Sequence, residues 1–438
     1  MLSVPHTRTT LPNGLDVIVH EDHRMPLAAV NVWYHVGSKN ERTGLTGLAH
    51  LFEHLMFEGS EHSPGGYFGP LQEAGASLNG STSTDRTNYW ELVPTGALRL
   101  ALWMEADRMG WLLPALTQDR LDTQRGVVLN ERRQSYENRP YGLAQFTMMS
   151  ALFPASHPYH WPTIGEPSDL EAATLDDVTA FFARYYHPGN ASLAIAGDVD
   201  TATVLRVVEE LYGDIPAGVP VPRVEAPTPV PVPRRMIMED HVELARLYLG
   251  WPSPGLFAAG DAELDLVSDL MANGRTSRLY SRLIHDRRIA VELAAGQTSR
   301  ELGGTFQIIA SAAPGHTLDE LETAIHEEVA RFVSEGPTAD EVDRGRAQAE
   351  TAFVYRVQSL GGFGGKADQL NAYNTYQQAP DSFQADLDRY LSASRESLRD
   401  TTGHWLLRER ATTLAVVPTG GDGETPLRDA ERVDRGRS

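Results

Sequence analysis

A run dense in proline divides the chain into two halves of similar length. Seven prolines lie between residues 216 and 233, and because proline has no backbone N–H and a fixed φ, such a run cannot continue a helix or a central strand. It favours extended polyproline geometry instead. At 438 residues the chain is also too long for one ordinary hydrophobic core. We therefore expect two domains, at 1–215 and 236–438, joined by a linker at 216–235.

The two halves show similar patterns of strand and helix. Each opens with β-prone runs and ends with a helix followed by an apolar strand, at 190–198 in the first half and 410–418 in the second. Asn13-Gly14 marks a hairpin turn. The expected fold class is α+β, with two homologous domains that are each a mainly antiparallel sheet covered by helices. Further patterns predict strands at 28–36, 76–84 and 88–93, and helices at 98–109, 121–136 and 175–186.

Composition limits the kinds of function that the chain can have. An apolar content of 41% with 22% charged residues is typical of a globular protein. A formal net charge of −21 argues against nucleic-acid binding and favours neutral or basic partners. The chain has no cysteine, so any metal must be held by His, Asp or Glu.

No membrane segment is expected, because no run approaches the roughly 20 apolar residues that span a bilayer. The N-terminus lacks a basic segment followed by an apolar run, which a signal peptide would show. We expect a cytoplasmic protein, or a periplasmic or secreted one if a signal peptide has been removed.

The pattern His50-x-x-Glu53-His54 lies in a run that is otherwise apolar between Gly47 and Phe57. Positions i, i+3 and i+4 share one face of a helix, so two imidazoles and a carboxylate project together. An apolar helix should be buried, and buried polar groups need partners. Zinc is the simplest partner, because neutral imidazoles bind it and a neighbouring carboxylate can take a proton from water. The alternative is chance, since the same residues can form an ordinary salt-linked surface.

A hydrolytic zinc site usually has three protein ligands and a fourth position for water. Two histidines therefore predict a third ligand elsewhere in the chain. The best candidate is Glu131, which stands late in the helix predicted at 121–136. The turn before it is apolar, so a lone carboxylate there would be costly.

These residues resemble the inverted zincins, a peptidase family that includes pitrilysin, insulin-degrading enzyme and the mitochondrial processing peptidase. The family carries His-x-x-Glu-His on one helix and a glutamate ligand at the spacing found here, 131 − 54 = 77 residues after the second histidine. The resemblance extends over nearly the whole chain. It includes further segments at 11–15, 37–38, 79–83, 157–159, 164–165 and 185–191.

The resemblance implies a zinc metalloendopeptidase that cleaves unfolded peptides. In this interpretation His50, His54 and Glu131 hold Zn²⁺, while Glu53 acts first as general base and then as general acid. The domain at 1–215 is then the catalytic one, and the domain at 236–438 is homologous but lacks the metal motif.

The resemblance also assigns residues around the metal. The strand with Asn79, Gly80 and Ser81 should hold the substrate backbone as an added strand. The family has Asn-Ala where this chain has Asn79-Gly80, a change that should keep the backbone contacts and loosen the strand. The family often carries an acid seven positions before the third ligand, where this chain has Gln124. An amide there cannot supply negative charge behind an imidazole.

The family fold implies half of a clamshell chamber, which a second subunit should complete. Single-chain and homodimeric relatives carry an Arg and a Tyr seven residues apart that reach the scissile carbonyl. Aligned on Ser277-Arg278-Leu279, these positions are Ile284 and Val291, and no Arg from 275 to 288 has a Tyr seven positions later. We therefore expect a heterodimer with a paralogous subunit that carries Arg-x6-Tyr.

Three alternatives stay open at this point. The chain can be a non-catalytic structural subunit that keeps the fold, as in respiratory-chain relatives. It can also be a zinc hydrolase of a non-peptide substrate. A homodimer can work with another donor, such as His285 or Arg287.

Overall fold

The computed structural model describes residues 2–226, 232–420 and 427–435, so residues 227–231 of the expected linker lie outside the described residues. The chain forms two compact units. Unit 1 comprises Met1–Asn130, Pro162–Val224 and Ala352–Ala385, and unit 2 comprises Glu131–Trp161, Glu225–Thr351 and Asp386–Ser438. Within the described part of the chain, no helix is long and apolar enough to cross a bilayer.

The sheet of unit 1 has the strand order β1-β2-β6-β3-β5-β4. Its strands are β1 (Thr7–Thr10), β2 (Asp16–Glu21), β3 (Leu27–Tyr34), β4 (Ser77–Thr82), β5 (Thr87–Pro94) and β6 (Ala191–Gly197). Asn13 and Gly14 form the predicted hairpin turn between β1 and β2, and Gly14 adopts a φ of 90° that favours glycine. β2 and β6 pair in parallel, whereas the other pairs of this sheet are antiparallel.

The sheet of unit 2 has the order β12-β7-β11-β8-β10-β9, which repeats that of unit 1 except at one edge, where the two-residue β12 pairs in parallel and β1 pairs antiparallel. Its strands are β7 (Arg235–Asp240), β8 (Arg246–Ser253), β9 (Ala290–Thr298), β10 (Gly304–Ala312), β11 (Thr412–Pro418) and β12 (Glu431–Arg432). In both sheets the first long strand pairs in parallel with the last one, β2 with β6 and β7 with β11. The α+β class with a duplicated sheet is thereby confirmed, and the sheets are mixed with a majority of antiparallel pairs.

The predicted helices are present, together with others that the sequence analysis did not predict. They are α1 (Leu48–Leu55), α2 (Phe68–Glu73), α3 (Leu98–Trp111), α4 (Gln118–Arg132), α5 (Ala144–Leu152), α6 (Pro167–Ala172), α7 (Leu175–Tyr185), α8 (Thr201–Tyr212), α9 (Asp261–Ala272), α10 (Leu318–Glu335), α11 (Ala339–Arg356), α12 (Lys366–Gln377), α13 (Phe383–Ser392) and α14 (Arg395–Trp405). The helix predicted at 121–136 is α-helical only to Arg132. From Arg133 to Glu137 it continues as the π-helical turn η4.

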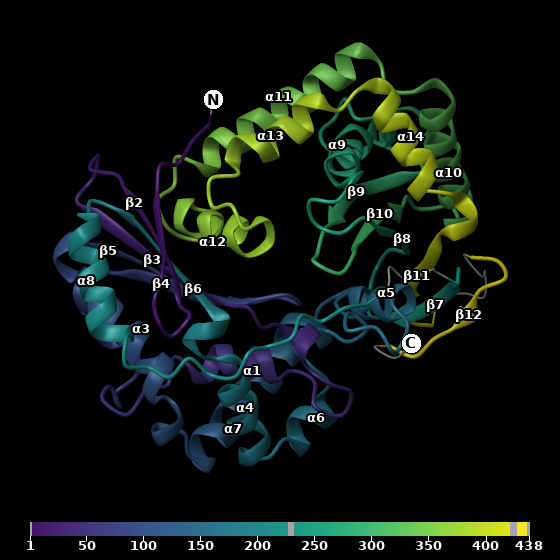
Figure 1. Cartoon of the computed structure of the whole chain (residues 1–438). Coiled ribbons are helices and arrows are strands. Elements are labelled where there is room, and N and C mark those ends of the chain that lie inside the picture. Colours follow the sequence, from purple (N-terminus) through teal and green to yellow (C-terminus); the bar gives the residue numbers. More distant parts are fainter. Residues whose placement is uncertain (1, 227–231, 421–426, 436–438) are drawn as a thin grey trace. The chain divides into compact units, whose positions relative to one another are not determined.

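Each unit takes a helix from the opposite half of the sequence. α12 packs on β3 and β6 of the first sheet, and α5 packs on β8 and β11 of the second (Figure 1). The contact of α12 with its sheet is polar: Trp33 Nε1 donates to Asp368 Oδ1 at 2.7 Å, and Asn371 Nδ2 donates to Asn31 Oδ1 at 2.9 Å. The compact units are therefore not continuous in sequence, and the domain boundaries expected at the linker stay a prediction.

Candidate metal centre

The helix α1 begins at a carboxylate clamp. Gly47 N–H donates to Glu41 Oε2 at 2.9 Å, and Ala49 N–H donates to Glu41 Oε1 at 2.8 Å. The first N–H groups of a helix have no partner within the helix, and a negative charge there also favours the helix dipole. Glu41 therefore defines where α1 starts, and with it the position of His50 one turn later.

Two glycines allow a close approach behind the start of α1. Gly47 has a φ of 89° and Gly165 has a φ of 78°, values that favour glycine. A Cβ on Gly47 would lie 2.9 Å from Gly165 Cα, and a Cβ on Gly165 would lie 2.4 Å from Gly47 Cα. Neither position has room for a side chain, so both turns depend on glycine.

The opposite side of α1 is apolar and anchored by aromatic residues. The Phe52 ring stacks on Phe181, with ring centroids 5.9 Å apart. The Tyr89 hydroxyl donates to the Phe52 carbonyl at 3.2 Å, and the Tyr186 hydroxyl donates to the Ala49 carbonyl at 3.5 Å. Burial raises the pKa of both tyrosine hydroxyls, so they stay protonated as donors. These contacts anchor the apolar side of α1 to its neighbours.

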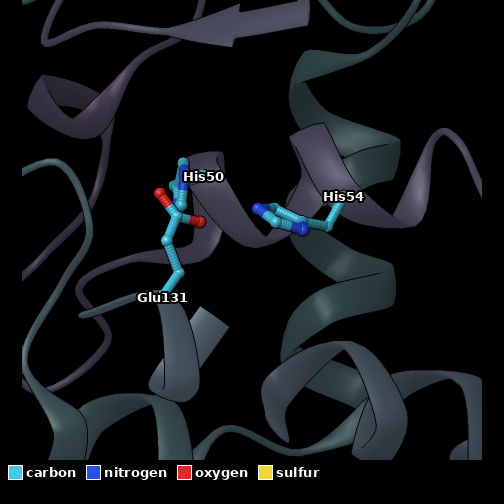
Figure 2. A group of neighbouring side chains, drawn as sticks. All are labelled: His50, His54 and Glu131. Carbon is cyan, nitrogen blue, oxygen red and sulfur yellow. The ribbon is translucent and has the colours of Figure 1, made fainter. Parts of the chain in front are cut away.

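The structure brings together the three residues predicted as metal ligands. One ligand atom each from His50, His54 and Glu131 lies within 4.8 Å of the others, and none of the three side chains is fully exposed. Figure 2 shows the Glu131 carboxylate beside His50, with the His54 imidazole pointing toward the pair. Two nitrogens and one oxygen are the donor set of hydrolytic zinc sites, with bonds of about 2.0–2.2 Å. The residues present therefore fit a zinc ion by their donor types and their proximity.

Glu131 reaches this position from the end of α4. The α-helix gives way to the π-helical turn η4 two residues later, and π-helical turns are frequent at functional sites. Earlier in α4, Gln124 Nε2 donates to Glu58 Oε1 at 2.7 Å, and Arg120 donates to the Gly59 carbonyl at 3.2 Å. Both contacts hold α4 to the segment that follows His54. The expected place of Gln124 behind a ligand imidazole stays a prediction.

Glu53 lies on α1 between the two histidines, and its carboxylate has a partner that sequence analysis missed. The Thr82 hydroxyl donates to Glu53 Oε2 at 2.7 Å. Thr82 is the last residue of β4, three residues after Asn79. Its place in a Ser/Thr-rich strand was visible in the sequence, but nothing there assigned one of these hydroxyls to Glu53.

The strand β4 lies at the edge of its sheet, where β5 is its only paired strand within the described ranges. Asn79 is exposed, and its side-chain oxygen accepts the Gly80 N–H at 2.8 Å. Gly80 is buried. A Cβ there would lie 3.0 Å from the Tyr89 ring and 3.1 Å from the Phe57 ring, so the position has little room for a side chain. The Ser81 hydroxyl donates to Asn88 Oδ1 at 2.6 Å, away from the open edge.

The positions expected for the family's Arg and Tyr carry no donor side chain. Ile284 lies in the π-helical turn η6 (Tyr280–Asp286) and packs against the core of unit 2. Val291 lies on β9 and is 49% exposed. Of the substitutes considered, His285 contacts its neighbour Asp286 at 2.9 Å, and Arg287 pairs with Glu320 at 3.4 Å.

Two family models match the chain. Residues 16–157 match the one described as "Insulinase (Peptidase family M16)", and residues 172–349 match the one described as "Peptidase M16 inactive domain". Together they span most of the chain and include strands of both sheets, while β1, β11 and β12 lie outside the matched residues.

Known proteins and solved structures are similar over almost the full length. "Zinc protease PqqE" of Helicobacter pylori is 28% identical over 423 residues, which are 94% of this chain and 93% of that protein. A crystal structure of a protease from Helicobacter pylori has a TM-score of 0.86 at 26% identity and covers 95% of this chain and 100% of that one. A Pseudomonas fluorescens structure described as a "peptidase M16 inactive domain" has a TM-score of 0.82 at 19% identity and covers 95% of this chain and 98% of that one. At this identity the similarity shows the fold alone.

Proposed function

The chain belongs to the M16 (insulinase) family of peptidases, and on that premise we propose that it is a zinc metalloendopeptidase acting on unfolded peptides. One observation carries the proposal. His50 and His54 on α1 meet Glu131 on α4, with ligand atoms within 4.8 Å of one another. This is the donor set that hydrolytic zinc enzymes use, and a relative that is similar over 94% of the chain is named a zinc protease.

The residues divide the chemistry between them. When bound, zinc activates a water molecule and polarises the peptide carbonyl. His50, His54 and Glu131 hold the ion. Glu53 takes a proton from the attacking water through a carboxylate oxygen and returns it to the leaving amine, since cleavage of an amide needs both transfers.

The strand β4 is the proposed substrate site. Its open edge offers backbone N–H and C=O groups to an extended peptide, which would add to the sheet as a further strand. Recognition of this kind depends on backbone and tolerates many sequences, but it requires an unfolded segment. The Gly80 N–H now donates to the Asn79 side-chain oxygen at 2.8 Å, so a substrate strand that pairs with this N–H would replace that bond.

A second subunit is proposed to complete the site. Ile284 and Val291 are apolar and cannot donate to the developing oxyanion, a contact that is commonly worth about 10²–10³ in rate. A paralogous partner carrying Arg-x6-Tyr would supply both donors across a closed chamber. The isolated chain should then cleave peptides slowly.

The second candidate function is a non-catalytic subunit that keeps the fold. It is favoured by the description of the model that matches residues 172–349 as an inactive domain, and by the apolar Ile284 and Val291. It does not explain why the three ligands and Glu53 are all present. The cytoplasmic location stays a prediction under either function.

Metal analysis and a fluorogenic peptide assay test the proposal. Wild-type protein should hold close to one zinc per chain, and His54→Ala should lose it. Glu53→Gln should keep the zinc and lower kcat by at least about 100-fold, whereas Glu73→Gln, the same change at the exposed end of α2, should have no effect. Each assay is run on the chain alone and with a candidate Arg-x6-Tyr subunit.

The outcomes separate the two functions. Wild type that stays metal-free after zinc supplementation would refute the metal site. An active Glu53→Gln variant would refute the role of Glu53 as the base. Zinc-loaded wild type without cleavage in either assembly would favour the structural subunit, and full activity of the chain alone would remove the need for a partner.

A further inference from the structure

The hydroxyl of Thr82 lies where it can control the orientation of Glu53. We propose that Thr82 is a positioning residue that links the substrate strand β4 to the proton-transferring carboxylate of α1. The inference rests on the proposed peptidase function and adds to it a residue that acts through Glu53. Its foundation is the hydrogen bond of 2.7 Å from Thr82 Oγ1 to Glu53 Oε2.

The strand β4 sits directly on the end of α1. Side chains of a strand alternate between its two faces, so Gly80 and Thr82 share the face that looks toward α1. Gly80 fits against Phe57 and Tyr89 without room for a side chain. The backbone therefore approaches α1 closely enough for the next residue on this face, Thr82, to reach Glu53.

The end of β4 is fixed from its other side. The Ser81 hydroxyl donates to Asn88 Oδ1 at 2.6 Å, and Arg86 NH1 donates to the Ser81 carbonyl at 2.9 Å and to its hydroxyl at 2.7 Å. These bonds hold the residue before Thr82 in one conformation. The hydroxyl of Thr82 is thus presented to Glu53 from a rigid strand end.

A positioned donor matters for a glutamate because its terminal torsion is broad. The carboxylate rotates about χ3 with little preference, yet proton transfer requires an oxygen within hydrogen-bond reach of the water. A bond at Oε2 restricts this rotation, and a carboxylate has further acceptor capacity at its second oxygen. Threonine suits this role better than serine, because its branched Cβ restricts χ1.

The same bond connects substrate binding to catalysis. A peptide that adds to the open edge of β4 pairs with the backbone of the strand that carries Thr82. Ordering of that backbone would then also order the hydroxyl that holds Glu53. This coupling predicts an effect on kcat that is larger than the effect on KM.

Three variants test the role of Thr82 in the assembly that gives wild type its activity. Thr82→Val keeps the shape and removes the donor, so kcat should fall roughly tenfold, at the lower end of the 10–100-fold typical of orienting partners in metal sites. KM and zinc content should stay within about twofold of wild type. Thr82→Ser should restore most of the lost kcat. Thr351→Val, the same change on the exposed face of α11, should leave all three values unchanged.

A second readout does not need activity. Urea unfolding of the metal-free protein is compared for wild type, Thr82→Val, Glu53→Ala and the double variant. The midpoint shifts should be non-additive, because removal of either partner breaks the same bond. Additive shifts, or a Thr82→Val enzyme as active as wild type, would overturn the inference. Wild type that is inactive in every assembly would overturn the proposed function as well, whereas active wild type with an unaffected Thr82→Val variant would overturn this inference alone.

Discussion

Replacing Gly47 by alanine tests how strictly the start of α1 positions the metal centre. Gly47 stands immediately before α1, three residues before His50, with a φ of 89°. An alanine Cβ would lie 2.9 Å from both Gly165 Cα and the Ile164 carbonyl oxygen. Both contacts are with backbone, so no side chain can rotate away. The helix start or the Gly165 loop must move.

The expected loss of stability has two parts. A non-glycine residue in the left-handed region costs about 1–2 kcal/mol. Overpacking against a fixed backbone typically adds about 1–3 kcal/mol, which gives roughly 2–5 kcal/mol in total. A shift of about 1 Å at the helix start carries His50 with it, and misplacement of that size can lower kcat/KM by about 100-fold.

Gly44→Ala is the matched control. Gly44 has nearly the same φ, 85°, but a Cβ there would meet nothing within 4 Å. The Gly44→Ala variant should lose only the about 1–2 kcal/mol of unfolding free energy that backbone strain costs. Its zinc affinity and kcat/KM should stay at the wild-type values. The free energy of unfolding from urea titration and the zinc content measure both effects. Equal losses for the two variants would refute the close approach of Gly47 to Gly165 as the cause.

Two further predictions concern carboxylates. Burial raises the pKa of Asp265 to about 6 from an ordinary 3.8, so the folded chain binds this proton more tightly and stability falls as the pH rises from about 4 to 6, by about 3 kcal/mol. Asp265→Asn keeps an oxygen that accepts from the Tyr390 hydroxyl. It should raise the free energy of unfolding, measured by urea titration, by about 1–3 kcal/mol at pH 8 and hardly at pH 4. An equal effect at both pH values would contradict the raised pKa of Asp265. Gln124→Glu places a carboxylate against Glu58, where the Gln124 amide now donates at 2.7 Å, and should cost about 1–3 kcal/mol at pH 8 and less at pH 4. A Gln124→Glu variant that is more stable than wild type at pH 8 would refute that contact.

The sequence alone determined the parts of this protein that depend on local periodicity. The faces of a helix follow from a spacing of three and four residues, so the spacing of His50, Glu53 and His54 is enough to predict that they project together. Strands and helices with strong apolar patterns were likewise predicted within a few residues, and the similar order of elements in the two halves anticipated the repeated sheet topology. Glu131 was predicted from its apolar surroundings and from the spacing that the resemblance to the inverted zincins implies.

Only the tertiary structure decided how distant segments meet. Thr82 and Glu53 are 29 residues apart and belong to different elements, so no local pattern relates them. The close approach of Gly47 to Gly165 depends on two turns that the chain brings together.

The packing of α5 and α12 against the sheet of the opposite sequence half was likewise decided only by the tertiary structure. The sequence of α12 is rich in polar residues and is typical of a solvated helix, yet Asn371 is buried and donates to Asn31 on β3. Polar residues can be buried when hydrogen bonds replace those to water. The partners of these α12 side chains lie about 340 residues away along the chain, and local sequence patterns carry no information about contacts at that separation.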